Sequence, residues 1–214
     1  MDLNTYSALD ELVSWYAARE IRERPKDVGD AFWRPTVLPI LMGEIKIIDI
    51  LSAIERRAHS GGVLVAGSGD GREVAFLAKL GYDVVGIELN PALAKHSKSL
   101  MDVLAQEGRV ERLRTRIVQG DFLDDYTYHS NGLRFEDFRT IFAYLLDSNF
   151  QGLVKKIGQQ SPSGTELYAL RPVEWEEPRI GLKRIGRYGV AVENTSPDKP
   201  VFVPHYNLMR YRKS

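Results

Sequence analysis

The sequence predicts an α/β protein with a mostly parallel, doubly wound sheet that helices cover on both faces. From residue 63 onward, short β-like runs alternate with amphipathic helical segments, and a glycine-rich turn follows the first run. Alternation of this kind implies right-handed crossovers between parallel strands. Near the end, two β-like runs are joined by the turn-rich TSPDKP with no helix between them. They predict an antiparallel hairpin at the edge of the sheet.

The hydrophobic pattern sets the expected elements. Apolar and alternating runs predict strands at residues 63–66, 83–87, 114–118, 139–146, 165–170, 184–194 and 201–211. Apolar residues at helical spacing predict helices at residues 7–24, 37–58, 71–80, 91–106 and 147–158. Gly61 and Gly62 separate the first two helices from the rest. We therefore expect an N-terminal helical extension over residues 1–60, a cap or substrate region, and a main domain over residues 61–214.

The composition excludes several classes of protein. Lys+Arg and Asp+Glu both count 29, so net charge gives no reason to expect nucleic acid or an anionic membrane. There is no cysteine to form a disulfide or a thiolate nucleophile, and the 4 histidines show no metal-ligand spacing, so we expect no metal. The polar start MDLNTYSALDE and the charges within the apolar stretch 37–51 predict a cytoplasmic protein without a membrane span. The oligomeric state stays open.

A run of basic residues lies before and within the third predicted strand. It comprises Arg109, Arg112, Arg114 and Arg116, and Lys183, Arg184, Arg187 and the RYRK tail add to it. Such a run is compatible with RNA binding, but a solvated face is the favoured interpretation. We do not expect nucleic acid as a partner.

The most informative stretch is VLVAGSGDGREVAFLAKLGYDVVGIELN, from Val63 to Asn90. Gly67, Gly69 and Gly71 stand between a strand and a helix, where they would let the backbone turn tightly and approach a nucleotide-like ligand. Glu88 ends the next strand 19 residues after Gly69, where a carboxylate can accept two hydrogen bonds from a ribose diol. Glycines alone would equally suit close packing of helix on strand, and the acidic strand end favours the nucleotide site.

The position of the third glycine distinguishes between nucleotides. The dinucleotide-binding pattern G-x-G-x-x-G has its third glycine at the position of Arg72. Here the third glycine is Gly71, one residue earlier, which makes the spacing G-x-G-x-G. That spacing, the closing hairpin and QGDFLDD resemble the class I S-adenosylmethionine-dependent methyltransferases. The resemblance implies a seven-stranded Rossmann-like methyltransferase sheet, with S-adenosylmethionine as cofactor bound by residues 61–214. The family usually has an acid two residues before the first glycine, and here that position is Val65.

The resemblance also implies the cofactor-binding residues. In the family the glycine loop cradles the methionine moiety, the acid at the position of Asp121 faces the adenine amino group, and its neighbour Phe122 flanks the ring. The cofactor-binding residues expected on this basis are Gly67, Ser68, Gly69, Gly71, Glu88, Leu89, Asp121 and Phe122.

The motifs GSGDGR, GIEL and YLL resemble one branch of protein lysine methyltransferases, which contains archaeal broad-specificity enzymes and the ATP-synthase c-subunit enzymes. FWRPTVLPILMGEI is a loose counterpart of the YVPTP segment of that branch. The resemblance implies a protein lysine as the methyl acceptor. It fades after YLL, where the family's proline is Asp147.

Methyl transfer from a sulfonium is an in-line displacement, so alignment is the main task of the protein. On the order of one lysine in two thousand is neutral at pH 7, and a dry aromatic pocket lowers the lysine pKa. We expect Tyr144, at the end of the fourth strand, to wall such a pocket, and Asp147 to orient the amine or receive its proton. Tyr144 as a core aromatic and Asp147 as a helix cap are open alternatives. So are a small-molecule acceptor and a non-catalytic nucleotide-binding protein.

Overall fold

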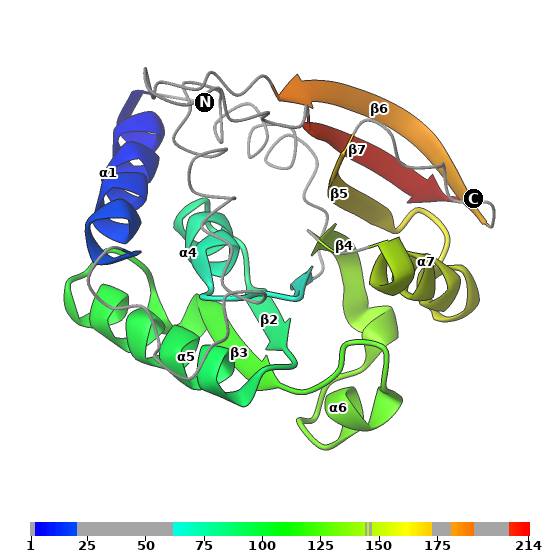
Figure 1. The fold of residues 1–214 in the computed structure, drawn as a ribbon, viewed down its shortest axis with the longest axis horizontal. Helices are drawn as coiled ribbons and strands as arrows, with labels where there is room; N and C mark the ends of the chain where they lie inside the picture. The colour runs from blue at the N-terminus through cyan, green and yellow to red at the C-terminus, as the bar shows by residue number, and fades with distance from the viewer. Residues whose placement is uncertain (1–2, 21–61, 144, 146, 173–180, 191–205) are drawn as a thin grey trace, which may run out of the picture.

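The computed structural model describes residues 3–20, 62–143, 145, 147–172, 181–190 and 206–214 (Figure 1). The helix expected at residues 37–58 and the boundary expected at residue 60 lie outside this part of the chain, and both stay predictions. The helices are α1 (Leu3–Glu20), α4 (Arg72–Lys79), α5 (Pro91–Gln106), α6 (Asp125–His129) and α7 (Asp147–Gln160). The strands are β1 (Gly62–Ala66), β2 (Val84–Glu88), β3 (Thr115–Gln119), β4 (Phe138–Ala143), β5 (Glu166–Pro172), β6 (Leu182–Val190) and β7 (Tyr206–Lys213).

The seven strands form one sheet in the order β3-β2-β1-β4-β5-β7-β6. Strands β1 to β5 pair in parallel, and β7 runs antiparallel to both β5 and β6. The predicted doubly wound α/β sheet with a C-terminal antiparallel hairpin is therefore confirmed. The order reverses between β1 and β4, and open α/β sheets bind their ligands outside the carboxyl ends of the strands at such a point.

The predicted elements differ from the observed ones mainly at their ends. The strand expected at 139–146 ends at Ala143. The sequence pattern missed α6, which has only 5 residues and so cannot show a helical period. Asp124 caps this short helix by accepting a hydrogen bond from the backbone N–H of Tyr126 at 2.9 Å.

The sheet has a hydrophobic core on each face because neighbouring strand residues point to opposite sides. Val63 and Val65 of β1 belong to the core that α1, α4 and α5 cover. Leu64 and Ala66 belong to the core that α6 and α7 cover. The two sets of helices lie on different sides of the strands in Figure 1. This layering leaves the strand ends, rather than the faces, for ligands.

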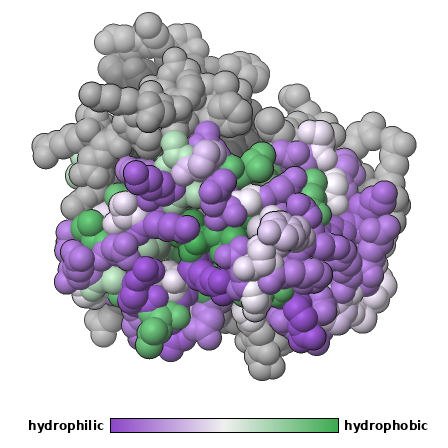
Figure 2. Space-filling model, turned by 90° about the horizontal axis from the view of Figure 1, so that it is seen from below, coloured by the Kyte–Doolittle hydropathy of each residue, from purple (hydrophilic) through white to green (hydrophobic). Residues whose placement is uncertain are grey.

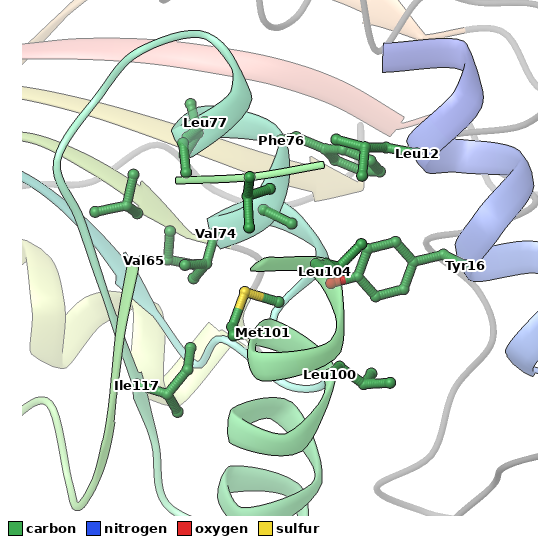
Figure 3. Packing of buried hydrophobic residues seen from close by; sticks show 14 of the residues in the cluster. Leu12, Tyr16, Val65, Val74, Phe76, Leu77, Leu100, Met101, Leu104 and Ile117 are labelled. Atoms are coloured by element: carbon green, nitrogen blue, oxygen red, sulfur yellow. The ribbon is translucent and has the colours of Figure 1, made fainter. Parts of the chain in front are cut away.

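Helix α1 is part of the first core. Leu12 and Tyr16 are 1% and 2% exposed, and Figure 3 shows both pointing from α1 toward the side chains of α4 and α5. The Tyr16 ring meets the Phe76 ring edge-on, with centroids 5.9 Å apart. At the far end of α5, the indole N–H of Trp15 donates to Glu107 Oε2 at 2.8 Å. Helix α1 therefore packs against α4, which the glycine loop precedes, and against the end of α5.

The basic run around β3 is engaged with the chain itself. Three of its arginines form ion pairs: Arg109 with Glu107 at 2.7 Å, Arg112 with Asp102 at 2.8 Å, and Arg114 with Glu111 at 2.8 Å. Arg116 donates to the carbonyl oxygen of Asn131 at 2.6 Å. These contacts support the interpretation of the run as a solvated face. Among the helices that the structure describes, none combines the length and the apolar character needed to cross a bilayer.

Candidate functional site

Glu88 ties three strand ends together. Its Oε2 accepts a hydrogen bond from the backbone N–H of Gly69 at 2.8 Å, and its Oε1 accepts one from the N–H of Asn90 at 2.8 Å. Its main-chain carbonyl accepts from the N–H of Gly120 at 3.0 Å, at the end of β3. The glycine loop, the start of α5 and the loop after β3 therefore converge on this residue.

The Glu88 carboxylate is buried, with 8% of the residue exposed. Burial raises its pKa above the usual value, while the hydrogen bonds from Asn90, Gly69 and Leu89 oppose that rise. A carboxylate has about four acceptor sites, and three backbone N–H groups use up to three of them. The side chain therefore keeps the capacity to accept a hydrogen bond from a ribose hydroxyl.

The glycine loop requires glycine for two different reasons. Gly69 has φ +55°, and among the described residues no atom lies within 4 Å of the place where a Cβ would stand. Gly71 has φ +82°, and a Cβ there would lie 2.2 Å from Ser97 Oγ on α5. Gly69 thus leaves an open surface beside Glu88, whereas Gly71 lets α5 approach the start of α4. The packing interpretation therefore applies to Gly71, and the ligand interpretation stays a prediction for Gly69.

Ser68 belongs to the supporting part of this loop. Its N–H donates to the carbonyl of Ile87 at 3.0 Å, and its own carbonyl accepts from Gly71 at 2.8 Å. Its side chain is 1% exposed and packs against Gly86, where a Cβ would stand 2.8 Å from Ser68 Oγ. Ser68 therefore shapes the loop, and its expected contact with a ligand stays a prediction.

The loop after β3 carries the residues expected at the adenine end. Asp121 Oδ1 accepts a hydrogen bond from the backbone N–H of Leu123 at 2.8 Å, and Phe122 is 6% exposed. Leu89, next to Glu88, is 64% exposed. The surface in Figure 2, seen from the edge of the molecule that lies at the bottom of Figure 1, is mostly hydrophilic with hydrophobic residues in small groups. Leu89 is therefore available to a ligand at the end of β2.

A buried ion pair, which was not predicted from the sequence, joins the glycine loop to the first residue of α4. The Arg72 guanidinium donates to both oxygens of Asp70, with Nε–Oδ1 at 2.8 Å and Nη2–Oδ2 at 2.5 Å. Both side chains are less than 10% exposed, at 7% and 9%. The guanidinium also lies 5.9 Å from the centroid of the Tyr16 ring on α1. GSGDGR places opposite charges at Asp70 and Arg72, two residues apart. That these side chains are buried depends on the tertiary fold and cannot be seen in the sequence.

The acceptor-side residues can be placed only in part. Tyr144 lies outside the described residues, and the backbone of Asp147 is the first residue of α7. Between them, the Leu145 side chain reaches the glycine loop, where a Cβ on Gly67 would lie 2.8 Å from Leu145 Cδ2. Leu145 therefore lies beside the glycine loop. The roles expected for Tyr144 and Asp147 stay predictions.

In the part of the chain that the structure describes, no group of three or more His, Cys, Asp or Glu side chains could hold a metal ion. What converges at the strand ends is one buried carboxylate, an open glycine backbone and a loop with an acid and an aromatic ring. This set can bind a nucleoside by hydrogen bonds and packing.

Comparison with known proteins supports the same family of folds. The sequence matches no protein-family model and no curated protein. Its structure is similar to a TehB-like S-adenosylmethionine-dependent methyltransferase from Corynebacterium glutamicum, with a TM-score of 0.55, 16% identity, and 96% and 100% of the two chains covered. A glycopeptide N-methyltransferase, MtfA, complexed with S-adenosylmethionine matches with a TM-score of 0.54, 13% identity, and 78% and 93% covered. An RNA methyltransferase from Salinibacter ruber, complexed with S-adenosylhomocysteine, matches with a TM-score of 0.50, 23% identity, and 78% and 90% covered.

These similarities show that the chain has the Rossmann-like fold of S-adenosylmethionine-dependent methyltransferases, and the predicted fold family is confirmed. They give no specific support to the lysine methyltransferase branch that the motifs resemble. The neighbours that name an acceptor name RNA and a glycopeptide.

We expect Glu88→Ala to weaken binding of S-adenosylhomocysteine more than tenfold, because a hydrogen bond to a charged group contributes about 1.5–3 kcal/mol and a tenfold change in affinity is about 1.4 kcal/mol. Calorimetric titration measures the affinity, and circular dichroism verifies the fold. Glu136→Ala removes an exposed carboxylate distant in sequence and serves as the control. An unchanged dissociation constant in a folded Glu88→Ala protein would remove Glu88 from the site.

Glu73, in the first turn of α4, gives a pH prediction. Burial raises its pKa from 4.5 to about 7, against the lowering effect of Arg72 and with a further rise from Asp70. The folded state thus holds this proton more tightly than the unfolded chain, so the resulting stabilisation is fully present below the unfolded pKa and is lost as pH rises through about 7. We expect Glu73→Gln to gain stability relative to the unmodified protein as pH rises.

Urea unfolding at several values between about pH 5 and pH 8 measures this difference in the free energy of unfolding. Glu136→Gln, at an exposed position, is the matched control. A difference for Glu73→Gln that stays constant over this range would show that Glu73 titrates as an ordinary carboxyl.

Proposed function

We propose that the protein is an S-adenosylmethionine-dependent methyltransferase that transfers a methyl group by in-line displacement. One observation carries the proposal: the Glu88 carboxylate lies at the end of β2, fixed by Gly69 of a left-handed glycine loop, with acceptor capacity left for a ribose hydroxyl. The methyltransferase fold of the chain supports it. Glu88 would hold the ribose hydroxyls, and the open backbone at Gly69 would admit the amino-acid portion of the cofactor.

The described residues also support a division of the site into a cofactor end and an acceptor end. Bound S-adenosylmethionine would supply an electrophilic methyl group on its sulfonium. Leu145 packs on the glycine loop, so it adjoins the position proposed for the amino-acid portion of the cofactor. We propose that Tyr144 walls the acceptor pocket and that Asp147 orients the acceptor or takes the proton it loses.

Two acceptor classes follow from different observations. The motifs GSGDGR, GIEL and YLL favour a protein lysine, which must reach the methyl group as a neutral amine. The glycopeptide N-methyltransferase among the structural neighbours favours a small acceptor. In either case the nitrogen–methyl bond forms as the sulfur–methyl bond breaks, and the nitrogen loses a proton. We propose a cytoplasmic enzyme, in keeping with the composition.

Thermal melting with S-adenosylhomocysteine, S-adenosylmethionine and NAD in parallel tests the cofactor. A ligand at 100 times its dissociation constant stabilises the folded state by about 2.7 kcal/mol, which is a visible shift. We expect a shift with the two sulfur nucleosides and none with NAD. A shift with NAD alone, or with none of the three, would contradict the proposal.

Methyl-labelled S-adenosylmethionine then separates the acceptor classes. The labelled cofactor is incubated with the protein and with either the macromolecular or the low-molecular-mass fraction of a cell extract. Label recovered as methyllysine after hydrolysis supports a protein lysine, and label in the small-molecule fraction supports a small acceptor. Cofactor binding without any transferred label would support a non-catalytic binding protein.

A further inference from the structure

Two buried side chains donate hydrogen bonds to carbonyl oxygens of the loop after β3. The hydroxyl of Tyr128 on α6 donates to the carbonyl oxygen of Phe122 at 2.7 Å. The ammonium of Lys156 on α7 donates to the next carbonyl, that of Leu123, at 3.0 Å. The two hydrogen bonds therefore fix the orientations of two consecutive peptide groups, Phe122–Leu123 and Leu123–Asp124.

Lys156 is an unusual residue for this position because its side chain is only 6% exposed. Its ammonium lies 5.0 Å from the centroid of the Tyr128 ring and 5.1 Å from that of Phe135. It also donates to the carboxylate of Asp125, whose pKa that hydrogen bond lowers. Gln160, one turn further along α7, donates to the same carboxylate at 3.1 and 3.2 Å.

Burying an ammonium is costly, and well-packed apolar groups in its place are often neutral or stabilising. Buried charges are retained in some proteins because they specify one conformation among several. Here the ammonium lies beside two rings and donates to two oxygen atoms, one of which is the Leu123 carbonyl in the loop that carries Asp121 and Phe122. Helix packing alone would be served by an apolar side chain, whereas only a donor can fix the Leu123 carbonyl.

The connection to Asp121 is direct. The Phe122 carbonyl and the Leu123 N–H belong to the same rigid peptide group. Tyr128 holds the carbonyl end of that group, and the N–H end donates to Asp121 Oδ1 at 2.8 Å. Lys156 fixes the following peptide and packs on the Tyr128 ring. The direction of the Asp121 carboxylate thus depends on both side chains.

We propose that Tyr128 and Lys156 are positioning residues for base selectivity: by fixing the loop, they aim Asp121 at the amino group of adenine. The inference rests on the proposed function, because it needs an adenine nucleoside at this end of the sheet. Neither residue touches the ligand. Their effect is on the choice between bases, and a residue with a merely structural role would not change that choice.

The test compares S-adenosylhomocysteine with S-inosylhomocysteine, in which a carbonyl oxygen replaces the amino group of the base. A carboxylate aimed at this position attracts the amino group and repels the carbonyl oxygen. Calorimetry gives both dissociation constants for the unmodified protein, Tyr128→Phe and Lys156→Met. The matched controls are Tyr126→Phe, at a side chain 74% exposed, and Lys155→Met, at the exposed neighbour on α7.

We expect the unmodified protein and both controls to prefer S-adenosylhomocysteine by about tenfold or more, and Tyr128→Phe and Lys156→Met to reduce that preference at least about threefold. Tyr128→Phe removes one oxygen atom and decides the outcome if Lys156→Met does not fold. An unchanged preference in folded variants, or no preference in the unmodified protein, overturns the inference while leaving the proposed function intact. Failure of the unmodified protein to bind either ligand overturns the proposed function and the inference with it.

Discussion

The hydrogen bonds of Glu88 are the constraint on which the site depends. Parallel strands deliver three separate loops to one edge of the sheet. Backbone hydrogen bonds from Gly67 and Ser68 to Ile87 join the glycine loop to β2, and Glu88 extends this connection to the other loops. Glu88 does so with one acceptor for each: Oε2 for the glycine loop, Oε1 for the start of α5, and its carbonyl for the loop after β3. A carboxylate that organises the site in this way is already in place and ordered when a ligand arrives, which lowers the entropic cost of binding.

Buried charged side chains support the loops around Glu88 from both faces of the sheet. On one face of the sheet, Arg72 of α4 pairs with Asp70 of the glycine loop, and its guanidinium lies 5.9 Å from the Tyr16 ring of α1. On the other face, Lys156 of α7 donates to the Leu123 carbonyl in the loop after β3. Helices α1 and α7 both lie far from Glu88 in sequence, and side chains of both lie near loops that Glu88 joins. The site is therefore a property of the whole sheet and of both its helix layers.

The features that could be predicted from the sequence are those that a short stretch of residues determines. The fold and the position of Glu88 could be predicted from the alternation of β1, α4, β2 and α5 and from the spacing of the glycines. Hydrophobic periodicity and the need for glycine in a tight turn are both visible in short stretches of sequence. Helix α6 was missed because 5 residues carry no period, and Asp70–Arg72 and Lys156 were missed because a charged residue in a sequence shows no direction. The motifs near YLL predicted a lysine acceptor, but a substrate pocket combines distant segments, and only the packing of Leu145 on Gly67 is described.

Calorimetric titration of S-adenosylhomocysteine into Gly69→Val and Gly81→Val is the most direct test of the central claim. Both glycines have positive φ, +55° and +94°, and neither has a described atom within 4 Å of a Cβ position, so both substitutions impose similar backbone strain. Of the two, only Gly69 lies beside Glu88, so only Gly69→Val places a side chain where the ligand is proposed to bind. The account predicts that Gly81→Val binds the ligand like the unmodified protein and that Gly69→Val does not bind. Equal binding by the two variants would contradict it.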